Sequence, residues 1–184
     1  MATVDRNTAN WRLYGGGGLL VGGILWVINE LLAANGTGAD VAKWLGIIGL
    51  IIVAIGFFLV GWGETGSNGA VGNDLLGKLG LAAASLGALL WGLLPIFSVA
   101  VAGTWLWVIA VLLVLGTLAG AYAITRKKVA RGLAKWAMYA VFLMALLYFL
   151  GATGGVTALA NWVIGLIFAI VVALTGLLYL LNRK

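Results

Sequence analysis

The chain has 184 residues, of which 64% are hydrophobic and 9% are charged, and its mean hydropathy is +1.15. Eleven basic and five acidic side chains are too few to give a core of this size the polar surface that water requires, so we exclude a soluble globular domain. The net charge of +6 does not indicate nucleic-acid binding, because the basic residues lie at the ends of apolar runs and not on one polar face.

Several kinds of chemistry are excluded by residues that the sequence lacks. It contains no cysteine and no histidine. Without cysteine there are no disulfides, thiolate metal sites or cysteine nucleophiles, and without histidine the commonest metal ligand and general base are missing. No nucleophile stands beside a base that would activate it. We therefore expect no catalytic residue, no metal and no cofactor.

Six apolar runs follow one another along the chain, separated by short polar segments. A hydrocarbon core about 30 Å thick needs about 20 helical residues to cross it, so each run is long enough to be a transmembrane helix. The first run is longer than the apolar core of a signal peptide, so we expect it to remain as a helix. The predicted helices lie at about 11–34, 41–62, 75–97, 103–124, 132–152 and 158–181.

Short connections pair these helices into three antiparallel hairpins. Hairpin 1 covers about 11–63, hairpin 2 about 75–126 and hairpin 3 about 132–184, and the hydrophilic segment 64–74 is predicted to be a flexible linker. The predicted fold is all-α: a polytopic membrane protein with six transmembrane helices in a single membrane domain, 1–184.

The segment that orients the helices is 125–135, which holds five of the eleven basic residues. Cytoplasmic loops of membrane proteins are enriched in lysine and arginine. With both termini on the cytoplasmic side, ten basic residues lie inside and Lys43 alone lies outside. We therefore expect a prokaryotic plasma (inner) membrane protein with both termini cytoplasmic, in contact with the lipid bilayer and not with nucleic acid.

An internal repeat relates hairpins 2 and 3. A shift of 57 residues superposes Lys78 on Lys135, Trp91 on Tyr148, Trp105 on Trp162 and Tyr122 on Tyr179. Because these are rare residue types in the chain, we interpret the match as a duplicated hairpin. Hairpin 1 fits more loosely, with Trp26 equivalent to Trp91.

Three of the aromatic residues, Trp26, Trp91 and Tyr148, are thus a candidate cluster. If they point inward, they meet near the axis of the repeat as a plug or as the wall of a ligand pocket. The alternative is that they face lipid or pack singly, as most of the tryptophans and tyrosines in this chain do near the ends of their spans.

Glu30 is the one carboxylate inside a predicted span, where an ionisable group is costly. Folding hairpin 1 about its turn places Glu30 near the level of Lys43, so the two are a candidate intramembrane ion pair. The alternatives are that Glu30 snorkels toward the membrane surface, or that it binds a cation, a proton or a polar ligand.

Small residues at helical spacing predict close helix contacts. The motifs Gly18-x-x-x-Gly22 and Gly116-x-x-x-Gly120 are of this kind, as are the glycines of the second and third predicted helices. The predicted helix-packing residues are Gly18, Gly22, Gly49, Gly56, Gly80, Gly116 and Gly120.

Three short hairpins in a chain of this length, with glycine-rich helices, resemble the HdeD-type six-helix bacterial membrane proteins. The resemblance covers the whole chain as a pattern, without a diagnostic motif. It implies a six-helix inner-membrane protein linked to acid stress and implies no role for any single residue.

Two functional hypotheses follow. The first is a non-enzymatic structural or accessory protein that packs with itself, as a homo-oligomer, or with other membrane proteins as a subunit of a larger complex, through its small-residue helix faces. The second is a binding or transport protein for a small lipophilic or aromatic solute, similar in size and helix count to the substrate-capturing subunits of vitamin importers. An inward aromatic cluster around an open cavity favours the second, and a tightly filled core with glycine faces turned outward favours the first.

Overall fold

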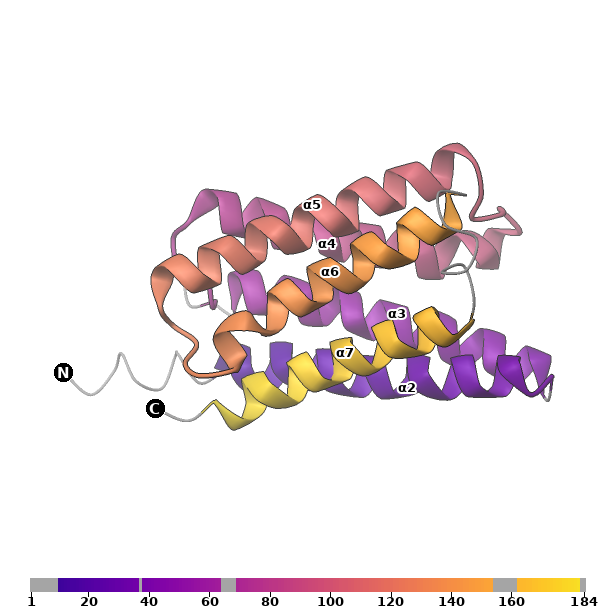
Figure 1. Ribbon diagram of the computed structural model, residues 1–184, viewed down its shortest axis with the longest axis horizontal. Helices are drawn as coiled ribbons and strands as arrows, with labels where there is room; N and C mark the ends of the chain where they lie inside the picture. The colour runs from indigo at the N-terminus through magenta and orange to yellow at the C-terminus, as the bar shows by residue number, and fades with distance from the viewer. Residues whose placement is uncertain (1–9, 37, 64–68, 154–161, 183–184) are drawn as a thin grey trace.

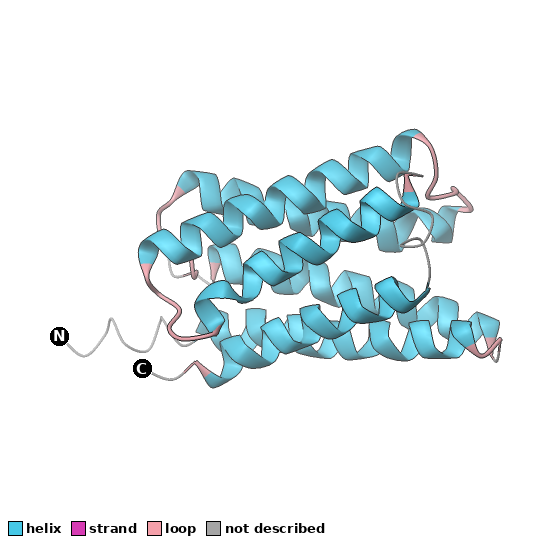
Figure 2. Cartoon of the chain, viewed as in Figure 1, coloured by secondary structure: helices cyan, strands magenta, loops and turns pink. Residues whose placement is uncertain are grey.

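The computed structural model describes residues 10–36, 38–63, 69–153 and 162–182. Within these residues it contains helices and no strand, joined by short loops (Figures 1 and 2). Six helical segments are long and apolar enough to cross a membrane, so the protein is an all-α polytopic membrane protein. The elements are η1 (Trp11–Gly16), α2 (Gly17–Ala34), α3 (Ala39–Trp62), α4 (Leu75–Leu93), η2 (Leu94–Phe97), α5 (Thr104–Lys127), α6 (Ala134–Ala152) and α7 (Trp162–Leu181).

Most boundaries lie within two residues of the sequence prediction. The clearest difference is that α5 continues to Lys127, where we expected an end near Ile124. Arg126 and Lys127 occupy its last turn, where positive charges interact favourably with the helix dipole. Several predicted features lie outside the described residues: Arg6, Arg183, Lys184, the linker at 64–68, the turn at 154–155 and the start of the sixth helix at 158–161.

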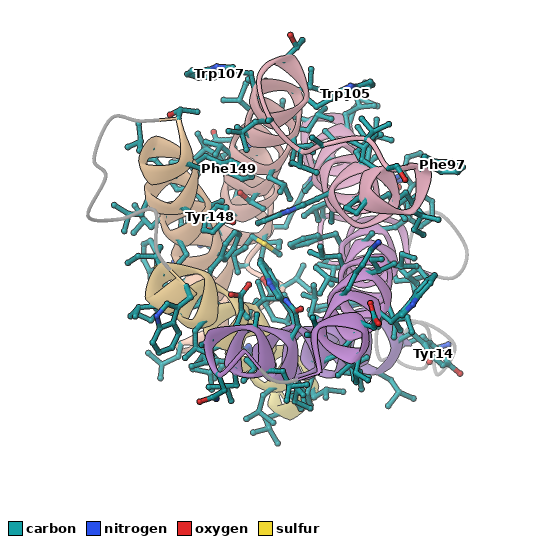
Figure 3. All side chains as sticks on the ribbon, turned by 90° about the vertical axis from the view of Figure 1, so that its right-hand side faces the viewer. Tyr14, Phe97, Trp105, Trp107, Tyr148 and Phe149 are labelled. Atoms are coloured by element: carbon teal, nitrogen blue, oxygen red, sulfur yellow. The ribbon has the colours of Figure 1, made fainter. Side chains whose placement is uncertain are left out.

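The helices form a closed ring. Each packs against the next in chain order, from α2 to α7, and α7 returns to α2. Figure 1 shows the helices side by side along one direction, and Figure 3 views the ring from one end. Large apolar side chains on the outside of the ring, such as Ile24, Ile55 and Leu115, are exposed, as expected of a surface that contacts lipid tails.

Glycines bring α2 and α3 into backbone contact. A Cβ atom added to Gly22 would lie 2.6 Å from the carbonyl oxygen of Gly49, and one added to Gly18 would lie 3.0 Å from the Cα atom of Gly56. No larger residue fits at such separations, so these four predicted packing residues hold hairpin 1 together.

The other predicted packing glycines lie between α4 and α5. A Cβ atom on Gly116 would lie 2.5 Å from the carbonyl oxygen of Gly80, and one on Gly120 would meet the side chain of Leu81. The same kind of contact joins η1 to α7, where a Cβ atom on Gly16 would lie 3.0 Å from the carbonyl oxygen of Gly176. All seven predicted packing glycines therefore contact another helix of the same chain.

The end of the hydrophilic segment between α3 and α4 is packed against the bundle. Ala70 and Val71 are completely buried, and the backbone N–H of Ala70 donates to the carbonyl oxygen of Val60 (2.7 Å). The polar composition of 64–74 led us to expect a flexible linker, but two small apolar side chains near its end are enough to dock this part on α3. Asp74 then begins α4 by accepting a hydrogen bond from the N–H of Gly77.

The first and last described segments meet at one end of the ring. Arg12 donates through Nη1 to the carbonyl oxygen of Asn182 (2.6 Å), and the Asn182 side chain accepts from the backbone N–H of Arg131 (3.3 Å). The segment 125–135, which holds five of the eleven basic residues, therefore lies at the same end as both ends of the described chain (Figure 1).

The packing at Gly22 leads to the first prediction. Gly22→Ala should lower the free energy of unfolding by about 1–3 kcal/mol, because the new methyl group must push apart two helix backbones. Gly17→Ala is the matched control: nothing lies within 4 Å of its added Cβ atom, and the change should be neutral or slightly stabilising. Thermal unfolding of the two variants in the same detergent measures this, and equal stabilities would contradict the assigned helix contact.

Candidate functional site

Five aromatic side chains pack against one another between the helices, and we call them the central aromatic cluster: Trp26, Trp91, Tyr148, Phe149 and Phe168. They come from α2, α4, α6 and α7. Ring centroids lie 5.2 Å apart for Trp26 and Trp91 and 5.1 Å apart for Trp91 and Tyr148. Both distances are in the range of favourable aromatic pairs. The three aromatic residues singled out in the sequence are thus neighbours inside the ring.

Trp91 is the centre of this cluster. Besides Trp26 and Tyr148, its ring lies 5.4 Å from Phe149 and 6.4 Å from Phe168. Trp26, Phe149 and Phe168 are buried, while Trp91 and Tyr148 are half-buried. The two half-buried rings therefore form the accessible surface of the cluster.

Trp26 is held in place by Glu30, one helical turn further along α2. The indole Nε1 donates to Glu30 Oε1 at 2.9 Å. On the other side of the carboxyl group lies Gly165 of α7, where an added Cβ atom would be 3.1 Å from both carboxyl oxygens. The bond satisfies the only polar atom of the buried indole, which would otherwise be costly in an apolar interior.

The partner that the structure gives Glu30 is the indole of Trp26, and no ion pair between Glu30 and Lys43 is present among the described residues. The turn does bring both residues to the same end of the hairpin. Glu30, however, points from α2 toward α7, whereas Lys43 lies on α3, the neighbour of α2 on the other side.

A cavity of about 410 Å³ lies between α2, α3 and α4, at the end of the ring opposite the two chain ends. Trp91 forms part of its wall, with Ile47 and Leu50 of α3 and with the backbone segment 99–101 before α5. Apart from the indole, its polar side chains are Asn29 and Lys43. A second cavity of about 330 Å³ follows around the α2–α3 turn, and Asn29 and Lys43 line that one too.

The interior is tightly packed beyond the cluster. Between Trp26, Trp91 and Phe168 and the next layer of side chains only about 10 Å³ remains, barely the space of one water molecule. Further toward the other end, Leu81, Ile124 and Met138 are completely buried. The cluster thus borders, through Trp91, a cavity at one end of the described structure.

A separate depression of about 210 Å³ lies between α5 and α6 on the outside of the ring. Its lining includes exposed Trp107 and Leu115 and is almost entirely apolar. Figure 3 shows Trp107 pointing away from the ring, so this depression faces the lipid and not the interior. Acyl chains of the bilayer fit such a surface.

Sequence reasoning missed Asn29, Phe149, Phe168 and Gly165. Asn29 carried a usable signal, because an amide inside an apolar span is unusual, and its side chain contacts Gly46 of α3. Phe168 carried none, since it has no aromatic equivalent in the repeat. Among the described residues, no three or more His, Cys, Asp or Glu side chains are grouped as they would be around a metal ion.

No protein-family model, no curated protein and no solved structure matches the chain. The resemblance to HdeD-type proteins and the internal repeat therefore stay predictions. The cavity and its lining are the features of the molecule that bear on its function.

The Trp26–Glu30 bond can be tested with a double-mutant cycle. Trp26→Phe and Glu30→Met together should destabilise the fold by about 1 kcal/mol less than the sum of the single changes, because each alone already removes the hydrogen bond. Trp26→Phe combined with Lys43→Gln is the control and should be additive. Additivity in both pairs would show that the bond does not contribute to stability.

Proposed function

We propose that this protein is a non-enzymatic membrane protein that binds a small lipophilic or aromatic solute. The observation that carries the proposal is the cavity of about 410 Å³ whose wall includes Trp91 of the central aromatic cluster. Its size falls within the range of small-molecule sites, which are mostly apolar with a few placed polar groups. Asn29 and Lys43 are such groups here.

The glycine contacts support this choice over a purely structural role. That role, the first hypothesis from the sequence, relied on small-residue faces that would be free to contact other proteins. Gly18, Gly22, Gly49 and Gly56 are instead occupied by the contact between α2 and α3, and Gly80, Gly116 and Gly120 by the contact between α4 and α5. Assembly with other chains would have to use other surfaces.

The charge distribution supports an orientation for the cavity. The basic residues of the α5–α6 connection lie at the end opposite the cavity, and under the positive-inside rule this end is cytoplasmic. We therefore place the cavity on the outer side of a prokaryotic inner membrane, with both termini cytoplasmic. A lipophilic solute then enters from outside the cell or from the outer leaflet.

Binding requires no large rearrangement, because the cavity is already open. Transport requires a second conformation in which the central aromatic cluster separates, since the interior beyond it is packed. The half-buried ring of Trp91 is the part of the cluster that lines the cavity and that a solute contacts.

Native mass spectrometry of the gently extracted protein tests the proposal, together with thermal stabilisation by a set of aromatic and lipophilic compounds. The wild type should carry an added mass of a few hundred daltons or be stabilised by at least one compound. Trp91→Ala should lose most of that binding, by tenfold or more, because an aromatic contact of about 1.5 kcal/mol or more is removed.

Trp107→Ala is the matched control, since this tryptophan is 59% exposed on the lipid-facing side and should leave binding unchanged. Trp91→Phe keeps a ring in the wall and should retain part of the binding if the alanine variant does not fold. Multiples of 19.1 kDa without added small molecules, and no stabilisation by any compound, would overturn the proposal in favour of assembly.

A further inference from the structure

The polar lining of the cavity indicates which class of solute it takes. Lys43 and Asn29 line both the cavity of about 410 Å³ and the adjoining one of about 330 Å³, and no carboxylate lines either. A solute that reaches Trp91 therefore passes an ammonium group and an amide, with apolar groups on all other sides.

The ammonium group of Lys43 is not neutralised by the carboxylates near it. Asp40, one turn earlier on α3, is exposed, and Glu30 is engaged with Trp26 and faces Gly165. Neither forms an ion pair with Lys43, and all three residues are within the described part of the chain. Lys43 is also the one basic residue that the sequence places at this end of the bundle, and its ammonium group is the one charged group in the lining of either cavity.

Asn29 and Glu30 are consecutive residues that face different neighbours. The Asn29 side chain contacts Gly46 of α3, and Glu30 faces Gly165 of α7. The amide is thus on the side of α2 that borders the cavity, and the carboxyl group is on the other side. A cationic solute meets no carboxylate in the lining of either cavity, whereas an anionic one meets an ammonium group and an amide.

We propose that the solute is an amphipathic acid, with a carboxylate that binds Lys43 and the Asn29 amide and an aromatic or alkyl body that packs on Trp91. This inference rests on the proposed function and specifies its ligand. Both polar groups donate hydrogen bonds, and a charge-assisted bond to an ammonium group is stronger than a neutral one. The apolar body then gains from burial against the indole and the α3 side chains.

The test uses three probes with the same body: 4-phenylbutyrate, 4-phenylbutanamide and 4-phenylbutylamine. Their affinities are measured by calorimetry with the full chain in nanodiscs of zwitterionic lipid. The acid should bind about five- to tenfold more tightly than the amide, as one partly solvated charge pair allows, and the amine most weakly. Raising the salt concentration should weaken the acid and leave the amide unchanged.

Lys43→Gln should reduce the affinity for the acid to that for the amide and leave the amide unchanged, while Lys43→Arg should retain the preference. Lys127→Gln, an exposed lysine at the opposite end, is the control and should change neither. Equal binding of acid and amide by the wild type, tighter binding of the amine, or a preference that survives Lys43→Gln would each overturn the inference.

These results are separable from failure of the proposed function. If the three probes bind equally and Trp91→Ala abolishes their binding, the site exists but does not select acids. If no probe binds up to about 1 mM, a concentration that reveals even weak ligands, and none of the compounds above stabilises the protein, both proposals fail together.

Discussion

The rest of the structure depends on the close approach of helix backbones at glycine. In a bilayer the lipid tails are as apolar as the side chains, so helices associate through contact and shape rather than through expulsion of water. Gly22 and Gly49 provide that contact within hairpin 1, and Gly16 and Gly176 provide it between the first and last helices. The second contact closes the ring, because it joins elements at opposite ends of the chain.

A closed ring of six helices leaves an axis that side chains must fill. Along much of the bundle small and branched residues such as Ala84, Leu81 and Val141 are completely buried between the helices. Nearer one end the larger rings of the central aromatic cluster take over. Trp91 belongs to this cluster and also forms part of the wall of the cavity. The packing of the interior and the lining of the cavity therefore share one side chain.

The positions of Asn29 and Glu30 along one helix, α2, decide which neighbouring helix each side chain faces. Successive residues of an α-helix differ by about 100° in direction, so Asn29 and Glu30 contact different neighbouring helices. The carboxyl group of Glu30 accepts the hydrogen bond of the Trp26 indole and holds that ring beside Trp91. The amide and Lys43 are left to face the cavity. One turn of α2 therefore contributes both to the packing of the site and to its chemistry.

The sequence alone determined the six spans, their pairing into hairpins and the end at which the basic residues gather. Bilayer thickness and the cost of charge in hydrocarbon act on local composition, so a single stretch of chain is enough to reveal them. Which side of each helix faces inward was decided only by the tertiary structure. These helices are apolar all round, and no polar stripe marks their inner face. For that reason the depth of Glu30 in the membrane could be predicted, but not its partner Trp26. Phe168 gave no sign of its place in the cluster. The glycines could not be assigned to contacts inside the chain.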